Sequence, residues 1–400
     1  MKNFLIAPLL CFFFLSGFAQ DAFLLSPDKQ LKVNLLIADG KPMYSVIYKG
    51  KMLLENSPLG LLTNEGDFST GVKYVSMVES TVSKDYAQDR IKKSNISYRA
   101  NKLIFTLQNA DKKAISIVFQ VSNNDIAYRY ELPAWAPTMS CIIEKEATGF
   151  KFPATTTTFL SPMMRPMTGF ARTAPSYESA YTADALMNTN NQNEGYVFPG
   201  LFHVDNKYWI LISETGVNGQ YCASHLSSYS KDNVFTIEYP NIKQNNGFGS
   251  SGAAVALPGI TPWRTITVGD HLKPIVETTI PFDVVEPLYE ASQPYKFGRA
   301  TWSWIVWQDN SMNYDDQVKY IDLAADLKYE YILMDALWDT NIGKERMSEL
   351  VKYANSKGVN VFLWYNSNGQ FNDAPQGPRN KMNTAVERKK EMKWLRDIGV

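Results

Sequence analysis

Tryptophan side chains stand beside acidic or amide side chains three times in the last quarter of the chain. An indole ring can stack on the apolar C–H face of a sugar ring, and carboxylate or amide oxygens can accept hydrogen bonds from its hydroxyl groups. The pattern therefore favours a carbohydrate site. In the alternative, the tryptophans fill a protein interior and the acids cap helices. The three groups are Trp302, Trp304, Trp307 and Asp309; Asp335, Trp338 and Asp339; and Trp364, Asn366 and Asn368.

Each group lies in the last part of a predicted β-strand or directly after it, and the predicted strands alternate with helices. The strands span 299–306, 331–334 and 359–365. Helices are expected after a cap at Asn313, over 344–356 before Gly358, and after the capping pair Thr384 and Glu387. Strands joined by helices of this length pair in parallel, so their carboxyl ends meet at one edge of the sheet. Two architectures fit this order, an open doubly wound sheet and a closed (β/α)8 barrel. The predicted sugar contacts at this edge are Trp302, Asp335, Trp338, Trp364 and Asn366.

The preceding part of the chain, from about residue 23 to 285, alternates apolar and polar residues in short runs. Runs at 32–37 and 44–48 flank the turn pair Asp39-Gly40, which predicts a hairpin. A second hairpin is predicted from 115–121 and 126–132, on either side of 123–125. Further short strands are expected at 103–107, 208–213, 234–239 and 265–268. This region is therefore predicted to form a large all-β sandwich.

Other motifs in the chain give weaker indications. The sequence from Gly247 to Gly252 matches the dinucleotide pattern G-x-G-x-x-G, but polar residues precede it and Pro258-Gly259 follows soon after, so an oxidoreductase is disfavoured. The three histidines lie far apart and lack the i, i+4 spacing of a helical zinc site. No G-x-S-x-G, P-loop or H-E-x-x-H motif occurs.

Composition limits the partners. The chain has 400 residues, 40 basic against 40 acidic side chains and therefore zero formal net charge, which argues against nucleic acid or an anionic membrane surface. A small neutral ligand such as an oligosaccharide fits this charge better. The oligomeric state stays open.

The first residues are typical of a secretory signal peptide. A lysine precedes an apolar run from Phe4 to Phe18, and small residues precede Gln20. We therefore predict a signal at 1–19, export to the periplasm, and a mature protein without a membrane anchor. Only Cys141 and Cys222 remain after cleavage. They can form a disulfide in an oxidising compartment, but two buried thiols are favoured.

Several runs of residues resemble glycoside hydrolase family 97. They are Glu194-Gly195-Tyr196, Thr261-Pro262-Trp263-Arg264, Gly298-Arg299-Ala300-Thr301-Trp302-Ser303-Trp304 and Tyr331-Ile332-Leu333-Met334-Asp335 with Trp338. The resemblance implies an exported exo-α-glycosidase of the α-galactosidase or α-glucosidase type. It also implies a β-supersandwich at 20–287 and a (β/α)8 barrel that begins at 288–400, of which this chain holds the first three βα units.

The same resemblance implies a calcium ion near the sugar site, with Glu194 as the matching ligand. It places the catalytic carboxylates beyond Val400, so we expect the 400-residue chain to be inactive by itself. The Trp-Ser-Trp run and the pair of Asp335 with Trp338 are closer to the retaining α-galactosidase branch. Ala336-Leu337 departs from the smaller or acidic residues expected there. An inverting α-glucosidase and a non-catalytic, exported carbohydrate-binding protein remain as alternatives.

Overall fold

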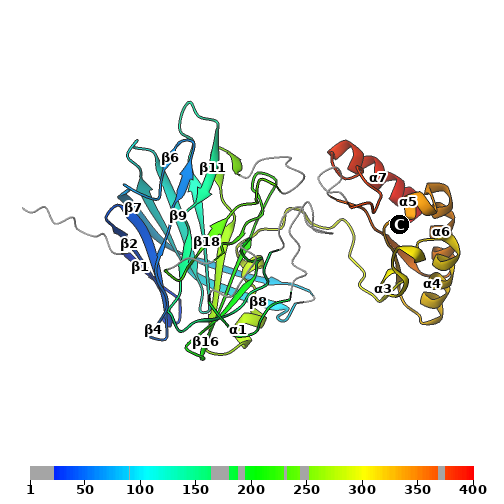
Figure 1. Ribbon diagram of the computed structural model, residues 1–400, viewed down its shortest axis with the longest axis horizontal. Helices are drawn as coiled ribbons and strands as arrows, with labels where there is room; N and C mark the ends of the chain where they lie inside the picture. Colours follow the sequence, from blue (N-terminus) through cyan, green and yellow to red (C-terminus); the bar gives the residue numbers. More distant parts are fainter. Residues whose placement is uncertain are drawn as a thin grey trace, which may run out of the picture. The chain divides into compact units, whose positions relative to one another are not determined.

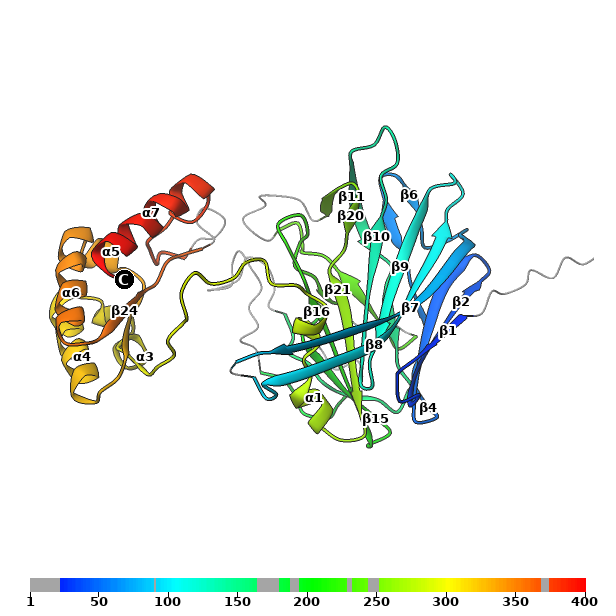
Figure 2. The ribbon, with the colours of Figure 1, turned by 180° about the vertical axis from the view of Figure 1, so that it is seen from behind.

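A computed structural model describes residues 22–89, 91–163, 180–187, 194–228, 232–243, 252–367 and 374–400. The described residues divide into two compact units. The first contains 22–163, 180–240 and 252–286, and the second contains 287–400 with the short stretch 241–243. Each unit has its own hydrophobic core. Figures 1 and 2 show the first unit as β-sheets and the second as a small sheet with helices.

The first unit begins with a four-stranded antiparallel sheet in the order β1-β2-β3-β4. Its second and third strands turn at Asp39 and Gly40, whose φ angles are 50° and 71°. Two positive φ values in a two-residue turn match the right-handed twist of a hairpin. The strands are β1 (Ala22–Leu25), β2 (Leu31–Ala38), β3 (Lys41–Tyr48) and β4 (Lys51–Pro58).

The largest sheet of the described residues has ten strands, and its main path runs β14-β13-β15-β16-β21-β10-β9-β8-β7. All of its pairs are antiparallel, and β20 pairs with the end of β10. The long β7 and β8 lie beside each other at one edge (Figure 2). The strands are β7 (Lys73–Ala87), β8 (Asn95–Gln108), β9 (Ala114–Val121), β10 (Asp125–Leu132), β13 (Thr157–Phe159), β14 (Ala185–Leu186), β15 (Gly200–Val204), β16 (Tyr208–Thr215), β20 (Gly259–Ile260) and β21 (Trp263–Gly269).

Smaller sheets and two short helices complete the first unit. Alternating side chains from β2, β3, β9 and β10 share one core, in which Tyr44 packs on both Phe119 and Tyr128. The first unit is therefore a β-sandwich, as predicted. The remaining elements are β5 (Leu61–Thr63), β6 (Gly66–Asp67), β11 (Ser140–Glu146) and β19 (Ala253–Ala256) in one sheet; β12 (Gly149–Lys151), β17 (His225–Leu226) and β18 (Val234–Glu238) in another; and α1 (Lys273–Glu277) with α2 (Ile280–Asp283).

A buried ion cluster joins two of these sheets. Arg264 on β21 donates from Nε and Nη2 to both carboxylate oxygens of Glu146 at the end of β11, at 2.9 and 2.6 Å. Its Nη1 donates to Glu214 on β16 at 2.5 Å and to the Ser224 hydroxyl at 2.9 Å. Burial by itself would lower the pKa of Arg264, but attraction to Glu146 and Glu214 raises that pKa well above its usual value. Arg264 therefore keeps its positive charge.

Two further acids, Asp125 and Asp283, hold the segment that follows β21. Asp125 accepts hydrogen bonds from the hydroxyls of Thr267 at 2.6 Å and Thr278 at 2.7 Å. Asp283 accepts from Tyr86 at 2.7 Å and from Thr279 at 2.9 Å. Burial raises the pKa of both carboxyl groups. The stretch that contains α1 and α2 is thus tied to the large sheet through neutral hydroxyl donors.

The second unit contains a parallel sheet in the order β22-β23-β24. Its strands are β22 (Ala300–Trp302), β23 (Tyr331–Met334) and β24 (Asn360–Leu363). Its core is built from β23 and β24 with apolar residues of the two longest helices between strands, among them Ile321, Met347 and Leu350. The helices are α3 (Trp304–Trp307), α4 (Tyr314–Asp326), α5 (Trp338–Asn341), α6 (Lys344–Ser356) and α7 (Ala385–Ile398), with a 3₁₀ turn at Gln308–Ser311.

Helix ends in this unit follow the predicted caps. The Asn313 side chain accepts from Asp316 N at the start of α4. The hydroxyl of Thr384 accepts from Glu387 N at the start of α7 and donates to the Glu387 carboxylate. Gly358 has a φ of 78°, as expected for a glycine that follows a helix. The predicted order of parallel strands and helices is thus observed.

Two details differ from the sequence prediction. The first strand was expected over 299–306, but β22 ends at Trp302 and the chain turns at once into α3. Apolar residues of a helix that packs on a sheet are expected to be buried, but Leu323 on α4 and Leu327 directly after it are 43% and 48% exposed, whereas the polar Gln317 is fully buried. Gln317 donates to Ser303 Oγ and to the Ser311 carbonyl oxygen, so hydrogen bonds replace the expected apolar contact.

Some predictions concern residues outside the described part of the chain. These are the signal peptide at 1–19, Asn368, and the glycine-rich run up to Ser251. Within the described residues, no helix is long and apolar enough to span a membrane. Cys141 and Cys222 are both free thiols, so the disulfide is not formed.

Candidate functional site

The carboxyl ends of β22, β23 and β24 lie side by side in the second unit. Trp302 pairs with Leu333, and Leu333 pairs with Phe362, in parallel register. The residues that follow these pairs therefore leave the sheet at the same edge. This edge is where open and closed parallel sheets bind ligands.

Two tryptophans at the end of β22 are fixed by carboxylates. Trp302 Nε1 donates to Asp335 Oδ2 at 2.7 Å, and Trp304 Nε1 donates to Asp309 Oδ1 at 3.0 Å. The two indoles stack with ring centroids 5.8 Å apart and an interplanar angle of 17°. Both rings are partly exposed. The first two strand ends thus present a pair of indoles whose polar edges are occupied and whose orientation is set.

Asp335 has much of its bonding capacity engaged within the protein. Besides accepting from Trp302, it accepts at Oδ1 from the backbone N–H of Ala336 at 2.6 Å. The residue is 7% exposed. A carboxylate can still accept further bonds from a ligand. Within the described residues, the side-chain contact of Asp335 is the hydrogen bond that orients Trp302.

The third strand end is closed by the segment Gln376-Gly377-Pro378. Backbone N–H groups of Asn366 and Leu337 donate to the carbonyl oxygens of Pro378 and Gly377, at 3.1 and 2.8 Å. The Asn366 side chain donates to Gln376 O at 3.2 Å and is buried, at 4% exposure. Asn366 therefore supports this segment, while the Trp364 side chain remains partly exposed at this end.

Trp338 lies in the core instead of at the surface. It is fully buried, its Nε1 donates to Trp364 O at 2.9 Å, and its ring stacks on Trp394 of α7 at 5.7 Å. A sugar cannot stack on a ring that has no exposed face. For Trp338 the described structure favours the alternative in which tryptophan fills the interior, and we correct the predicted sugar contact accordingly.

Glu194 lies in the first unit, and its position is fixed by the residues next to it. Tyr196 exchanges two backbone hydrogen bonds with Leu226, at 2.8 and 2.9 Å. Gly195 has a φ of 84°, and a Cβ there would lie 2.2 Å from Leu226 O. The Glu194-Gly195-Tyr196 run thus requires its glycine.

The predicted calcium site is not complete in the described residues. Calcium takes six to eight oxygen ligands. No group of three or more His, Cys, Asp or Glu side chains suited to a metal ion is found in the described ranges. Glu194 stays a candidate ligand, and the calcium ion stays a prediction from the resemblance.

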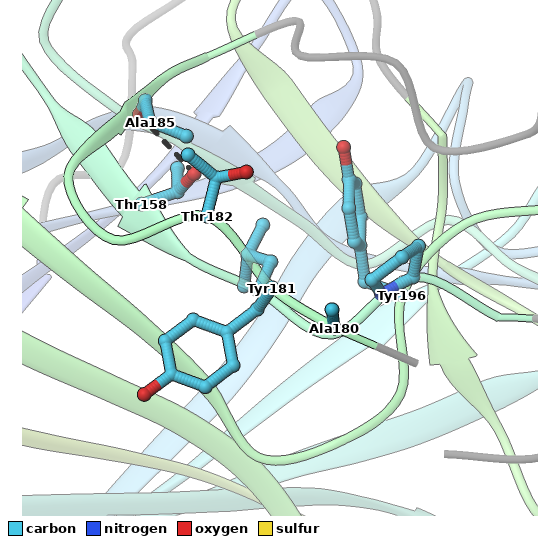
Figure 3. Close-up of a pocket in the computed structure, with 8 residues that line it drawn as sticks. Thr158, Ala180, Tyr181, Thr182, Ala185 and Tyr196 are labelled. Carbon is cyan, nitrogen blue, oxygen red and sulfur yellow. Dashed lines mark hydrogen bonds between the residues drawn. The ribbon is translucent and has the colours of Figure 1, made fainter. Parts of the chain in front are cut away.

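The small pocket at Tyr196 is too small for a sugar. Tyr196 lines it with Thr158, Tyr181 and Thr182, and its volume is about 50 Å³. Figure 3 shows the Thr158 hydroxyl directed at Ala185, whose carbonyl oxygen it reaches at 3.3 Å, while the Tyr181 ring points away from Tyr196. This is room for one or two waters.

Sequence reasoning missed how the strand ends are tied together. Gln376 Nε2 donates to Asp309 Oδ2 at 3.2 Å, so the segments after β24 and β22 are linked directly. Asp309 stood out because it follows the first strand, whereas Gln376 has no local signal. Contacts across 67 residues of sequence depend on the tertiary fold.

Known glycoside hydrolases are similar to this chain. A family model described as the N-terminal part of glycosyl-hydrolase 97 matches residues 24–287. A probable retaining α-galactosidase from Streptomyces bingchenggensis is 26% identical over 356 residues, which cover 84% of this chain and 51% of that protein.

Solved structures are similar as well. The crystal structure of a β-arabinopyranosidase has a TM-score of 0.92 and 52% identity, over 95% of this chain and 61% of that one. A glycoside hydrolase family 97 enzyme from Pseudoalteromonas sp. strain K8, in complex with panose, has a TM-score of 0.73 at 20% identity, which shows a shared fold. This chain spans between 51% and 61% of the length of these relatives. The family model covers well over half of the chain, and the chain therefore belongs to glycoside hydrolase family 97.

Proposed function

We propose that this chain is part of an exo-acting glycosidase that releases a galactose-configured pyranose from an axial linkage. The observation that carries this proposal is the fixed indole pair, with its two carboxylates, at the carboxyl edge of a parallel sheet. Such an edge suits a sugar ring, because the indoles offer apolar surface and the neighbouring polar groups accept or donate hydrogen bonds.

Similarity to the two named activities narrows the sugar. A β-L-arabinopyranoside has its ring hydroxyls and its glycosidic bond in the same orientations as an α-D-galactopyranoside, and it lacks only the hydroxymethyl group on C5. The names β-arabinopyranosidase and retaining α-galactosidase thus agree with rings of one shape, with the arabinose taken as the L sugar. The higher identity to the former supports an arabinopyranoside as the preferred substrate, beside the galactoside and glucoside predicted from sequence.

The finer features of this function are part of the same proposal. We propose that β22, β23 and β24 belong to a (β/α)8 barrel, and that the reaction retains the anomeric configuration. A retaining mechanism places two carboxyl groups about 5–5.5 Å apart. Export to the periplasm is supported by the sequence of residues 1–19, and calcium by Glu194 and its resemblance to the family pattern.

The test is hydrolysis of aryl glycosides by the full-length protein. We expect release of nitrophenol from the β-L-arabinopyranoside and the α-D-galactopyranoside, both faster than from the α-D-glucopyranoside. Proton NMR of the first sugar released reports whether the configuration is retained. A protein that cleaves none of the three substrates, yet binds free galactose or arabinose, would instead be a carbohydrate-binding protein, and the enzymatic proposal would be refuted.

A further inference from the structure

A single carboxylate lies between two of the three strand ends. Asp309 accepts from the indole N–H of Trp304 through Oδ1 and from the amide of Gln376 through Oδ2, at 3.0 and 3.2 Å. Trp304 in turn stacks on Trp302. Asp309 therefore contacts, on one side, a ring of the proposed sugar surface and, on the other, the segment that closes the third strand end.

The backbone before Asp309 is held in an unusual conformation. Gln308 has φ 50° and ψ −145°, at the point where α3 ends and the 3₁₀ turn begins. Such a conformation is costly for a residue with a Cβ and persists only where surrounding contacts enforce it. The turn brings Asp309 back toward Trp304, five residues earlier in the chain. The unusual conformation of Gln308 and the carboxylate of Asp309 thus both contribute to the hydrogen bond with Trp304.

The partner of Asp309 is anchored independently. Gln376 lies in the segment whose carbonyl oxygens accept from Leu337, after β23, and from Asn366, after β24. Residues after all three strands are therefore connected through Gln376-Gly377-Pro378, and Asp309 makes the link to the first.

We propose that Asp309 is a positioning residue, which holds Trp304 against Trp302 so that the two indoles form one fixed surface for the sugar. This inference rests on the proposed function, because it assigns the indoles to substrate binding. Asp309 itself is not expected to touch the reacting atoms. Its effect should pass through the orientation of Trp304 and through the tie to Gln376.

The test compares Asp309→Ala with Asp309→Asn in the full-length protein. An asparagine oxygen can still accept from Trp304, and the Gln376 amide can turn to accept from its NH₂ group. We expect the alanine variant to raise KM by about tenfold to a hundredfold, more than it lowers kcat, because a displaced binding surface weakens substrate binding. The asparagine variant should stay close to the parent protein. Asp315→Ala, which removes an exposed acid from the first turn of α4, is the matched control.

A spectroscopic readout separates positioning from general destabilisation. Stacked indoles give an exciton signal in circular dichroism, and the Trp338–Trp394 pair supplies a constant background. The difference spectrum between the parent and Asp309→Ala should match that between the parent and Trp302→Phe, and Asp309→Asn should show no such difference. This measurement needs no activity.

The possible outcomes have distinct meanings. An alanine variant that keeps the exciton signal, or loses it without any rise in KM in an active enzyme, refutes the role of Asp309. An asparagine variant as impaired as the alanine variant does so too. If the spectra behave as expected but the parent protein hydrolyses no glycoside, the positioning of the indoles is supported and the proposed function fails.

Discussion

Replacing Arg264 by methionine removes every charged donor from the buried cluster of the first unit. Arg264 contributes four hydrogen bonds, two of them to Glu146. The side chains of Arg264 and Glu146 are 1% and 0% exposed. Methionine has a similar length and no charge, so Glu146 would keep its negative charge in an apolar environment with only a 3.3 Å hydrogen bond from Tyr221.

The expected cost follows from this geometry. Breaking a buried ion pair by removing one partner costs about 3–5 kcal/mol, because the remaining charge is uncompensated. For a unit of this size each kcal/mol lowers the melting temperature by roughly 2–4 °C. The Arg264→Met variant should therefore unfold about 6–20 °C earlier than the parent protein.

Differential scanning calorimetry of the chain measures this change directly. The matched control is Arg99→Met, since Arg99 makes a two-pronged pair with Asp85 in the same unit while the two side chains are 47% and 64% exposed. Exposed pairs contribute about 0–1 kcal/mol, so this variant should barely move the transition. A double variant, Arg264→Met with Glu146→Leu, should recover part of the lost stability, because the fully buried acid is removed. Glu214, whose side chain is 13% exposed, remains and still accepts two hydrogen bonds from Ser224.

Two results would contradict this reasoning. One is an Arg264→Met transition within the range of the Arg99→Met control. The other is a double variant that is no more stable than Arg264→Met, which would mean that the lost packing of the arginine, and not the unpaired Glu146, causes the destabilisation.

Three other predictions concern single groups. Burial raises the pKa of Cys222 to about 11, so neither Cys222 nor the buried Cys141 should react with a thiol reagent at pH 8 until urea unfolds the protein, and fast labelling of the native chain would contradict this. Because the folded pKa of Asp125 is raised, the contribution of Asp125 to stability should fall as pH rises from about 4. In urea titrations the unfolding free energy of Asp125→Asn should therefore gain on that of the parent protein as pH rises above about 4, and a difference that does not change with pH would contradict this. Calcium at a hundred times its Kd should raise the unfolding free energy of the full-length protein by about 2.7 kcal/mol. The control Glu238→Ala, which removes an exposed acid of the first unit, should respond equally, whereas Glu194→Ala should not respond. An equal response in all three proteins would exclude Glu194 as a ligand.

Local sequence signals were sufficient for many elements of the fold. Asp39-Gly40 predicts a tight turn because both positions must adopt positive φ, and the structure has it there. The caps Asn313 and Thr384 likewise mark helix starts, since each side chain satisfies a free backbone N–H. The 15-residue β7 was not predicted, because most of its residues are exposed on both faces and give no alternation of apolar and polar residues.

The site was predicted only in part, for a physical reason. Sequence placed Trp302 and Asp335 at neighbouring strand ends, and they are hydrogen-bonded to each other. The sequence could not distinguish Trp302 from Trp338, because both lie near a predicted strand end and close to an acidic residue. In the structure Trp338 begins α5, is buried in the core and stacks on Trp394. Burial depends on which helix packs over a residue, and a spacing of three or four residues does not determine that.

The position of β21 in the large sheet has a consequence for how the chain folds during synthesis. It is the last strand of that sheet in the sequence, yet it lies between β10 and β16 and pairs with both. Thr267 and its partner Asp125 are 142 residues apart, an interval that a ribosome translates in roughly 7–28 s. Until β21 emerges, β10 and β16 each have a free edge that can pair with another nascent chain. The sheet is thus completed from its middle, and β21 joins its two halves by non-local contacts, which form slowly.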